Sequence, residues 1–249
     1  MLGRQHLTLS FFSGIIVFSP LIHVESSYFI LSVIGVCIGS LIPDVDAEDA
    51  SIFHSKVRGL KGDTGLILND FIAPLLPLFG YVTKYIIYRP LLVVYDKFLF
   101  SDYEFSDSHR DFTHSILGVF SITVFTGVLI GIPLHLIKEF NFVFLYVFLV
   151  GYLVGCLLHM LQDSCTRTGI AWNSPFSGRK LKGEIYTGKD FFKIHIFSLI
   201  LGVTSSLFLF VSFTGQFGFS FFRLSVFCIS TLLALWMMFL WRVNAEIVD

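Results

Sequence analysis

Long apolar runs are the feature that most constrains what this 249-residue chain can fold into. A helix needs about 17–25 predominantly apolar residues to cross a bilayer. With 55% hydrophobic and 14% charged residues, the chain is also poorer in charge than soluble domains, of which about 25% is charged. We therefore predict an all-α, polytopic membrane helical bundle of about six transmembrane helices. The predicted spans are residues 7–23, 28–42, 112–137, 142–161, 194–213 and 219–241, of which the first two are short.

The segment between the second and third spans, residues 43–110, is predicted to be an interfacial helical insert. Its apolar stretches are interrupted by Pro74, Pro77 and Pro90, and proline breaks the hydrogen bonding of a helix interior. No repeat or low-complexity tract divides the chain. We therefore expect a single membrane-embedded domain over residues 1–249, whose part 186–249 consists of the two C-terminal spans.

The distribution of basic residues predicts how the chain is oriented. Lys and Arg accumulate in cytoplasmic segments. If the N-terminus is cytoplasmic, all of the 17 Lys and Arg residues except Lys138 and Arg223 lie on that side. Both termini are therefore expected in the cytoplasm. The net charge of −1 gives no support to nucleic-acid binding. Because of the apolar spans, membrane lipids are the expected surroundings.

Histidine and aspartate residues lie at the cytoplasmic ends of the predicted helices. His159 and Asp163 are four residues apart, so on a helix they share one face. His109 and His114 are five apart, which places His109 in the first turn and His114 inside the third helix, an arrangement that could serve two metals. Antiparallel helices can bring such groups together in a bundle. The predicted metal ligands, all within residues 1–185, are His6, Asp44, Asp46, His109, His114, His159 and Asp163.

This ligand set predicts a hydrolytic metal site. Imidazole with carboxylate suits zinc, and also manganese or iron, while the four scattered cysteines are expected to be small hydrophobic residues. A bound ion can activate water near neutral pH, and a second ion can stabilise a leaving oxygen. We expect one to three divalent ions and phosphoester hydrolysis by metal-activated water. The predicted catalytic residues are His109, His114, His159 and Asp163.

Several of these residues also have simpler explanations. His6 could be an interfacial polar side chain, and Asp44 and Asp46 could cap the turn after Pro43. Asp111 fits a capping box with Ser108 and is left outside the ligand set. His54 stays a possible ligand because it follows Asp44 and Asp46 closely.

The polar and basic segment after Asp163 is a candidate substrate site. Arg179 can form two hydrogen bonds with a phosphate, Lys180 adds charge, and Thr166 supplies a hydroxyl. The alternative is that this basic segment binds lipid headgroups as a cytoplasmic anchor.

The motifs resemble those of the YdjM-like family of inner-membrane metal-dependent hydrolases. The resemblance rests on His6, Leu41-Ile-Pro-Asp44-Val-Asp46, His109-Arg-Asp-Phe-Thr-His114-Ser115, Gly151-Tyr152, and Leu158-His159-Met-Leu-Gln-Asp163 with Thr166 and Gly169. It implies a divalent-metal hydrolase of the inner membrane, with a more distant similarity to zinc-dependent phospholipases C and single-strand nucleases. It also suggests binding of a repressor protein, for which these residues show no surface.

Two departures from the family pattern stand out. Asp111 replaces the usual glycine, and the insert 43–110 is longer than usual.

Three other functions remain as alternatives. A metal-free lipid phosphatase also uses His-x-x-x-Asp, but its Pro-Ser-Gly-His element is missing before His159. A transporter would carry ionisable residues at mid-helix, whereas these lie at one boundary. A non-catalytic scaffold held together by its metal would need the same ligands.

Overall fold

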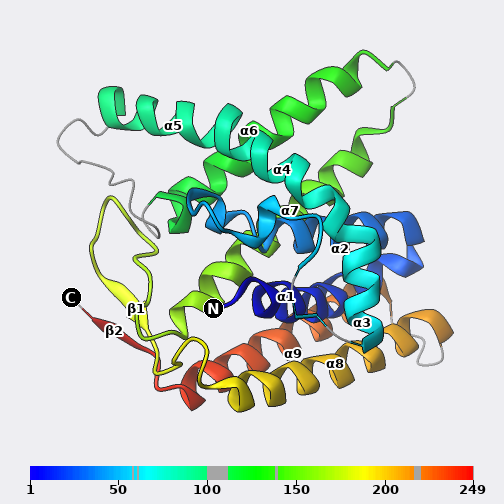
Figure 1. Cartoon of the computed structure of the whole chain (residues 1–249). Helices are drawn as coiled ribbons and strands as arrows, with labels where there is room; N and C mark the ends of the chain where they lie inside the picture. Colours follow the sequence, from blue (N-terminus) through cyan, green and yellow to red (C-terminus); the bar gives the residue numbers. More distant parts are fainter. Residues whose placement is uncertain (58, 61, 100–111, 138–139, 216–219, 249) are drawn as a thin grey trace.

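The computed structural model describes residues 1–57, 59–60, 62–99, 112–137, 140–215 and 220–248. It is a helical bundle in which α1, α2 and α7 are central, α8 and α9 lie on one side, and α4, α5 and α6 lie on the other, while α3 lies beside α1 near α8 (Figure 1). The principal helices are α1 (Gly3–Phe18, extended by a 3-10 turn at Ser19–His23), α2 (Ser26–Gly39), α6 (Ile116–His135), α7 (Phe142–Ser164), α8 (Phe191–Thr214) and α9 (Phe221–Arg242). The predicted all-α bundle is confirmed.

Within the described residues, six helical segments are long and apolar enough to cross a membrane. Five of them correspond to predicted spans, but the sixth does not. The predicted span 28–42 is the short α2, because the chain turns at Pro43–Asp46 and proline cannot continue a helix interior. The segment Gly65–Phe98, with 34 residues, takes the sixth place.

That sixth segment is a nearly continuous helix within the predicted insert. It comprises α3 (Gly62–Ile67), α4 (Leu76–Val82) and α5 (Arg89–Val94), joined through π-helical turns at Leu68–Ile72 and Thr83–Tyr88 and a 3-10 turn at Ala73–Leu75, and followed by a π-helical turn at Tyr95–Leu99. The three prolines do not break it. Each lies at the first or second residue of a helical piece, where its missing N–H leaves no hydrogen bond unmade.

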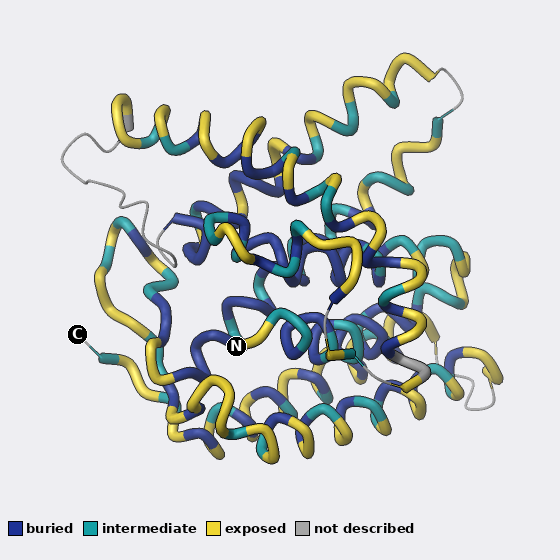
Figure 2. The backbone as a smooth tube through the Cα atoms, viewed as in Figure 1, coloured by how far each residue is buried: buried dark blue, intermediate teal, exposed yellow. Residues whose placement is uncertain are grey.

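The outer helices contain many exposed residues, while most residues of the central helices are buried (Figure 2). Phe192 of α8 and Phe222 of α9 are 76% and 74% exposed. Such large exposed apolar surfaces fit contact with lipid rather than water.

The closest helix packing joins α2 to α7. Gly35 and Gly39 of α2 lie against the backbone of Phe148 and Tyr152, and a methyl group at Gly39 would collide with the Tyr152 carbonyl oxygen. Gly151 and Gly155 of α7 face the backbone of α2 in the same way. Small residues four apart permit this close approach between membrane helices. The two helices run in the same direction, so their C-terminal ends lie together.

A short antiparallel sheet lies at the end of the bundle where α7 and α9 end. Strand β1 (Lys180–Lys182) pairs with β2 (Glu246–Val248), with Leu181 opposite Ile247. The starts of α1 and α6 lie at this end too (Figure 1). The polar ends of the helices therefore gather on one side of the bundle.

The α2–α7 contact predicts an unusual effect of a small substitution. Gly39→Ala should lower the free energy of unfolding in detergent by about 1–3 kcal/mol, because the added methyl overpacks the interface. Gly131→Ala is the matched control. Its methyl meets only Leu145 Cδ2 at 3.4 Å, so it should be neutral or stabilising, as alanine favours helix. Equal effects of the two substitutions would contradict this packing.

Candidate metal centre

Five of the predicted ligands meet at this end of the bundle. His6 lies near the start of α1, Asp44 in the 3-10 turn after α2, His114 in a 3-10 turn (Phe112–His114) before α6, and His159 and Asp163 in the last turns of α7. The side chains of His6, His114, His159 and Asp163 are at most 1% exposed, and that of Asp44 is 16% exposed. Residues far apart in sequence thus form one buried polar centre.

Two carboxylate oxygens in this centre each lie close to the same pair of imidazole nitrogens. The Nε2 atoms of His114 and His159 are 3.2 Å apart. Asp44 Oδ1 lies 3.7 Å from the first nitrogen and 3.5 Å from the second, and Asp163 Oδ2 lies 3.7 and 3.8 Å from them. Two nitrogens bound to tetrahedral zinc at about 2.0–2.1 Å are about 3.3 Å apart. The donor set therefore fits a divalent cation.

Hydrogen bonds outside the centre fix the tautomers of both imidazoles. His159 Nδ1 lies 2.8 Å from the carbonyl oxygen of Ser40, which can only accept, so Nδ1 carries the proton. The Thr113 hydroxyl donates to Asp46 Oδ2 at 3.1 Å and can therefore accept from His114 Nδ1 at 3.1 Å. In the neutral rings both Nε2 atoms then present lone pairs to each other. Only a proton or a metal ion between them relieves this repulsion.

His6 extends the centre on the other face of His159. The two rings stack with centroids 3.8 Å apart, and His6 Nε2 lies 3.4 Å from Asp163 Oδ1. His6, Asp44 and His159 also form a second group that could hold a metal, beside that of His114, His159 and Asp163. The donors therefore suffice for a fifth ligand or a second ion.

The carboxylates make the centre strongly attractive to cations. Burial raises the pKa of the Asp44 carboxyl, but the interactions with the neighbouring His159, His114 and His6 outweigh burial, and the pKa lies well below its usual value. Asp163 Oδ1 accepts a hydrogen bond from the amino group of Met1 at 2.6 Å. Two carboxylates in a buried site require positive charge nearby.

Cysteine has no part in this centre. All four cysteines are buried free thiols, and burial raises the pKa of Cys165 to about 12. A protonated thiol is a poor metal ligand.

The remaining predicted residues are placed differently. Asp46 lies outside both candidate ligand groups and reaches His114 through Thr113. His114 precedes α6 instead of lying inside it, because Ser115 accepts the Gly118 N–H and caps the helix. His54 is exposed. His109, Ser108 and Asp111 lie outside the described residues.

The predicted substrate residues do not face the centre as a group. The Thr166 hydroxyl is 1% exposed and donates to the Asp163 carbonyl oxygen at 2.7 Å, closing the end of α7. Arg179 and Lys180 are exposed, and Lys180 pairs with Val248 in the sheet. Thr113 and Ser40, which orient the imidazoles, escaped the sequence analysis, although Thr113 stands directly before His114.

Comparison with known proteins places the chain in a family. The family model described as YdjM inner membrane protein matches residues 1–244. No curated protein and no solved structure matches the chain. Since the family match covers nearly the whole sequence, including every part of the centre, the chain belongs to the YdjM inner membrane protein family.

Proposed function

We propose that this membrane protein is a metal-dependent hydrolase that acts on a phosphoester in a lipid or at the membrane surface. The observation that carries the proposal is the pair of imidazole Nε2 atoms 3.2 Å apart, flanked by the carboxylates of Asp44 and Asp163. Such mixed nitrogen and oxygen donors suit zinc or manganese.

Four residues, His114, His159, Asp44 and Asp163, would hold the ion, with His6 beside them. A divalent ion at this position supplies Lewis acidity toward a phosphoryl oxygen and activates water as a nucleophile. Hydrolysis then joins the water oxygen to phosphorus and breaks the P–O bond to the alcohol, which leaves with a proton. The partly exposed Asp44 marks the side from which substrate reaches the centre, because the other four side chains are buried.

The centre is proposed to face the cytoplasm. The starts of α1 and α6 and the ends of α2, α7 and α9 lie at the same end of the bundle as the basic strand β1. Positive residues favour the cytoplasmic side, so both termini and the centre share it.

Metal removal tests the hydrolase directly. Purified protein should cleave short-chain phospholipids or p-nitrophenyl phosphate esters, lose this activity on chelation, and regain it with zinc or manganese. Asp163→Asn should reduce turnover by roughly a hundredfold or more, since even second-shell changes cost about 10–100-fold. His135→Ala, at the far end of α6, is the control and should keep activity. Stoichiometric bound metal without any hydrolysis would overturn the proposal in favour of a metal-stabilised scaffold.

The orienting role of Thr113 has its own test. Thr113→Val removes the hydroxyl between Asp46 and His114, so His114 loses its fixed tautomer, and metal affinity should fall by about 10–100-fold. The matched control is Thr123→Val, whose hydroxyl donates only to the carbonyl oxygen of Val119 within α6. Competition titration with a chromogenic chelator measures both affinities. Unchanged affinity in Thr113→Val would show that this hydrogen bond does not tune the centre.

A further inference from the structure

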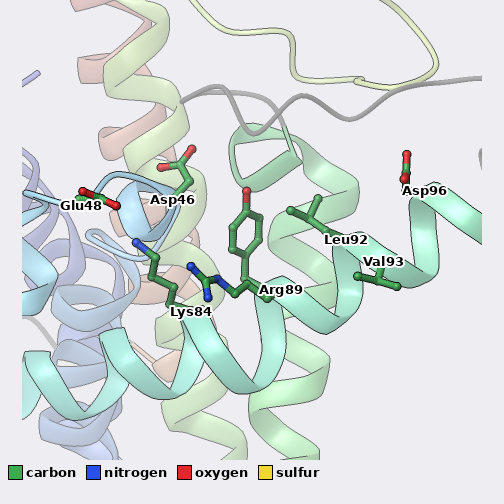
Figure 3. Close-up of a pocket in the computed structure, with 8 residues that line it drawn as sticks. Asp46, Glu48, Lys84, Arg89, Leu92, Val93 and Asp96 are labelled. Atoms are coloured by element: carbon green, nitrogen blue, oxygen red, sulfur yellow. The ribbon is translucent and has the colours of Figure 1, made fainter.

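A charged cavity lies beneath the helical segment that contains α4 and α5. Its volume is about 710 Å³. Asp46 and Glu48 line it from the turn after α2, and Lys84, Arg89, Leu92 and Val93 line it from the helix (Figure 3). The cavity is large enough for a small organic headgroup.

Lys84 is a buried cation without a counter-ion in the described structure. The residue is only 8% exposed, yet no carboxylate of the described residues lies within ion-pair distance of its ammonium group. The ammonium group lies over the Phe53 ring, whose centroid is 5.0 Å from Nζ. Arg89 likewise lies over the Tyr85 ring, at 4.7 Å, rather than against a carboxylate. An ammonium and a guanidinium group at the wall of one cavity can bind an anion there through charge-assisted hydrogen bonds.

The helix geometry turns both cations toward this cavity. In an α-helix, residues five apart point about 140° away from each other. Thr83–Tyr88 is instead π-helical, and the wider i→i+5 turn brings Lys84 and Arg89 to the same side. Such local π-helical turns are frequent at functional sites.

The cavity is connected to the metal centre by hydrogen bonds. Asp46 lines the cavity and accepts a hydrogen bond from Thr113 at 3.1 Å, and Thr113 contacts His114 Nδ1 at 3.1 Å. A group bound by the two cations would therefore lie beside Asp46, which is linked through Thr113 to the ligand His114.

The outer wall of the cavity is apolar, and the same helical segment carries exposed apolar side chains that suit contact with lipid. Leu92 and Val93 line the cavity, and Val93 is 51% exposed. Phe71, Leu78 and Ile86 of the same helical segment are also exposed. A ligand with an anionic headgroup and an acyl chain would match both the charged interior of the cavity and its apolar outer wall.

We propose that Lys84 and Arg89 bind the phosphate group of an anionic amphiphile, whose acyl chain passes along Leu92 and Val93 toward the bilayer. This assigns a substrate class to the proposed hydrolase and rests on that function. Glu48 and Asp96 also line the cavity, but within the described part of the chain neither forms an ion pair with Lys84 or Arg89.

Binding of dodecylphosphonate tests the proposal, because its C–P bond resists hydrolysis. The full-length protein in neutral maltoside detergent should bind it, and Lys84→Gln and Arg89→Gln should each weaken binding about tenfold, as expected for a lost charged hydrogen bond. Arg89 is exposed, so its substitution leaves the fold intact. Lys84→Arg should largely preserve binding. Lys97→Gln, an exposed cation on the same helical segment outside the cavity, is the matched control.

The outcomes distinguish recognition of a phosphate group from recognition of a whole amphiphile. They also distinguish the anion site from the proposed hydrolase activity. Displacement by inorganic phosphate would assign recognition to the phosphate group alone, and failure of phosphate to compete would assign it to the whole amphiphile. Both support the site if they depend on Lys84 and Arg89. Wild-type affinity in both glutamine variants, or equal loss in Lys97→Gln, would overturn it. Because this assay needs no turnover, its failure would leave the metal-content and hydrolysis results unaffected.

Discussion

The backbone contact between α2 and α7 is the constraint on which the rest of the structure depends. Gly35 and Gly39 lie against the backbone of Phe148 and Tyr152. Gly151 and Gly155 lie against the backbone of α2 in the same way, so closely that the carbonyl oxygen of Ser40 reaches His159 Nδ1 at 2.8 Å. This contact fixes the depth at which α2 ends and hence the position of Asp44. The contact also fixes the position of the His159 ring, whose Nε2 atom is the central donor of the site. The α2–α7 contact thereby sets the geometry of the centre at the ends of these two helices.

The Met1 ammonium group pairs with Asp163 Oδ1, but the other donors brought together by this packing repel one another unless a further cation joins them. Two lone-pair nitrogens and two carboxylates in a buried space are costly, because water no longer solvates them. A protein can hold such a group only where the surrounding structure enforces it. The close approach of these donors is therefore the reason to infer metal binding. Lys84 lines the neighbouring cavity and has no ion pair within the described residues, which is the reason to infer an anionic ligand. Together, cation and anion would balance the charges of this end of the bundle.

Much of this architecture follows from the sequence, but its distinctive parts do not. Five spans follow from apolar length, and the pairing of His159 with Asp163 follows from helical periodicity. The Gly-x-x-x-Gly spacings in α2 and α7 are typical of close helix packing, but a prediction based only on the length of apolar runs does not use them. The continuous helix across Pro74, Pro77 and Pro90 could not be predicted, because proline is neutral at a helix start and disruptive inside it. The cavity at Lys84 depends on a π-helical turn that sequence patterns do not reveal.

X-ray absorption at the metal edge tests the central claim most directly. We predict that the purified protein contains an ion with mixed nitrogen and oxygen ligands at about 2.0–2.2 Å, at least two of which are imidazoles. In His159→Ala the bound metal should be lost. A spectrum dominated by sulfur, or by water with no imidazole scattering, would contradict the account. Failure to bind zinc or manganese at all would contradict it equally.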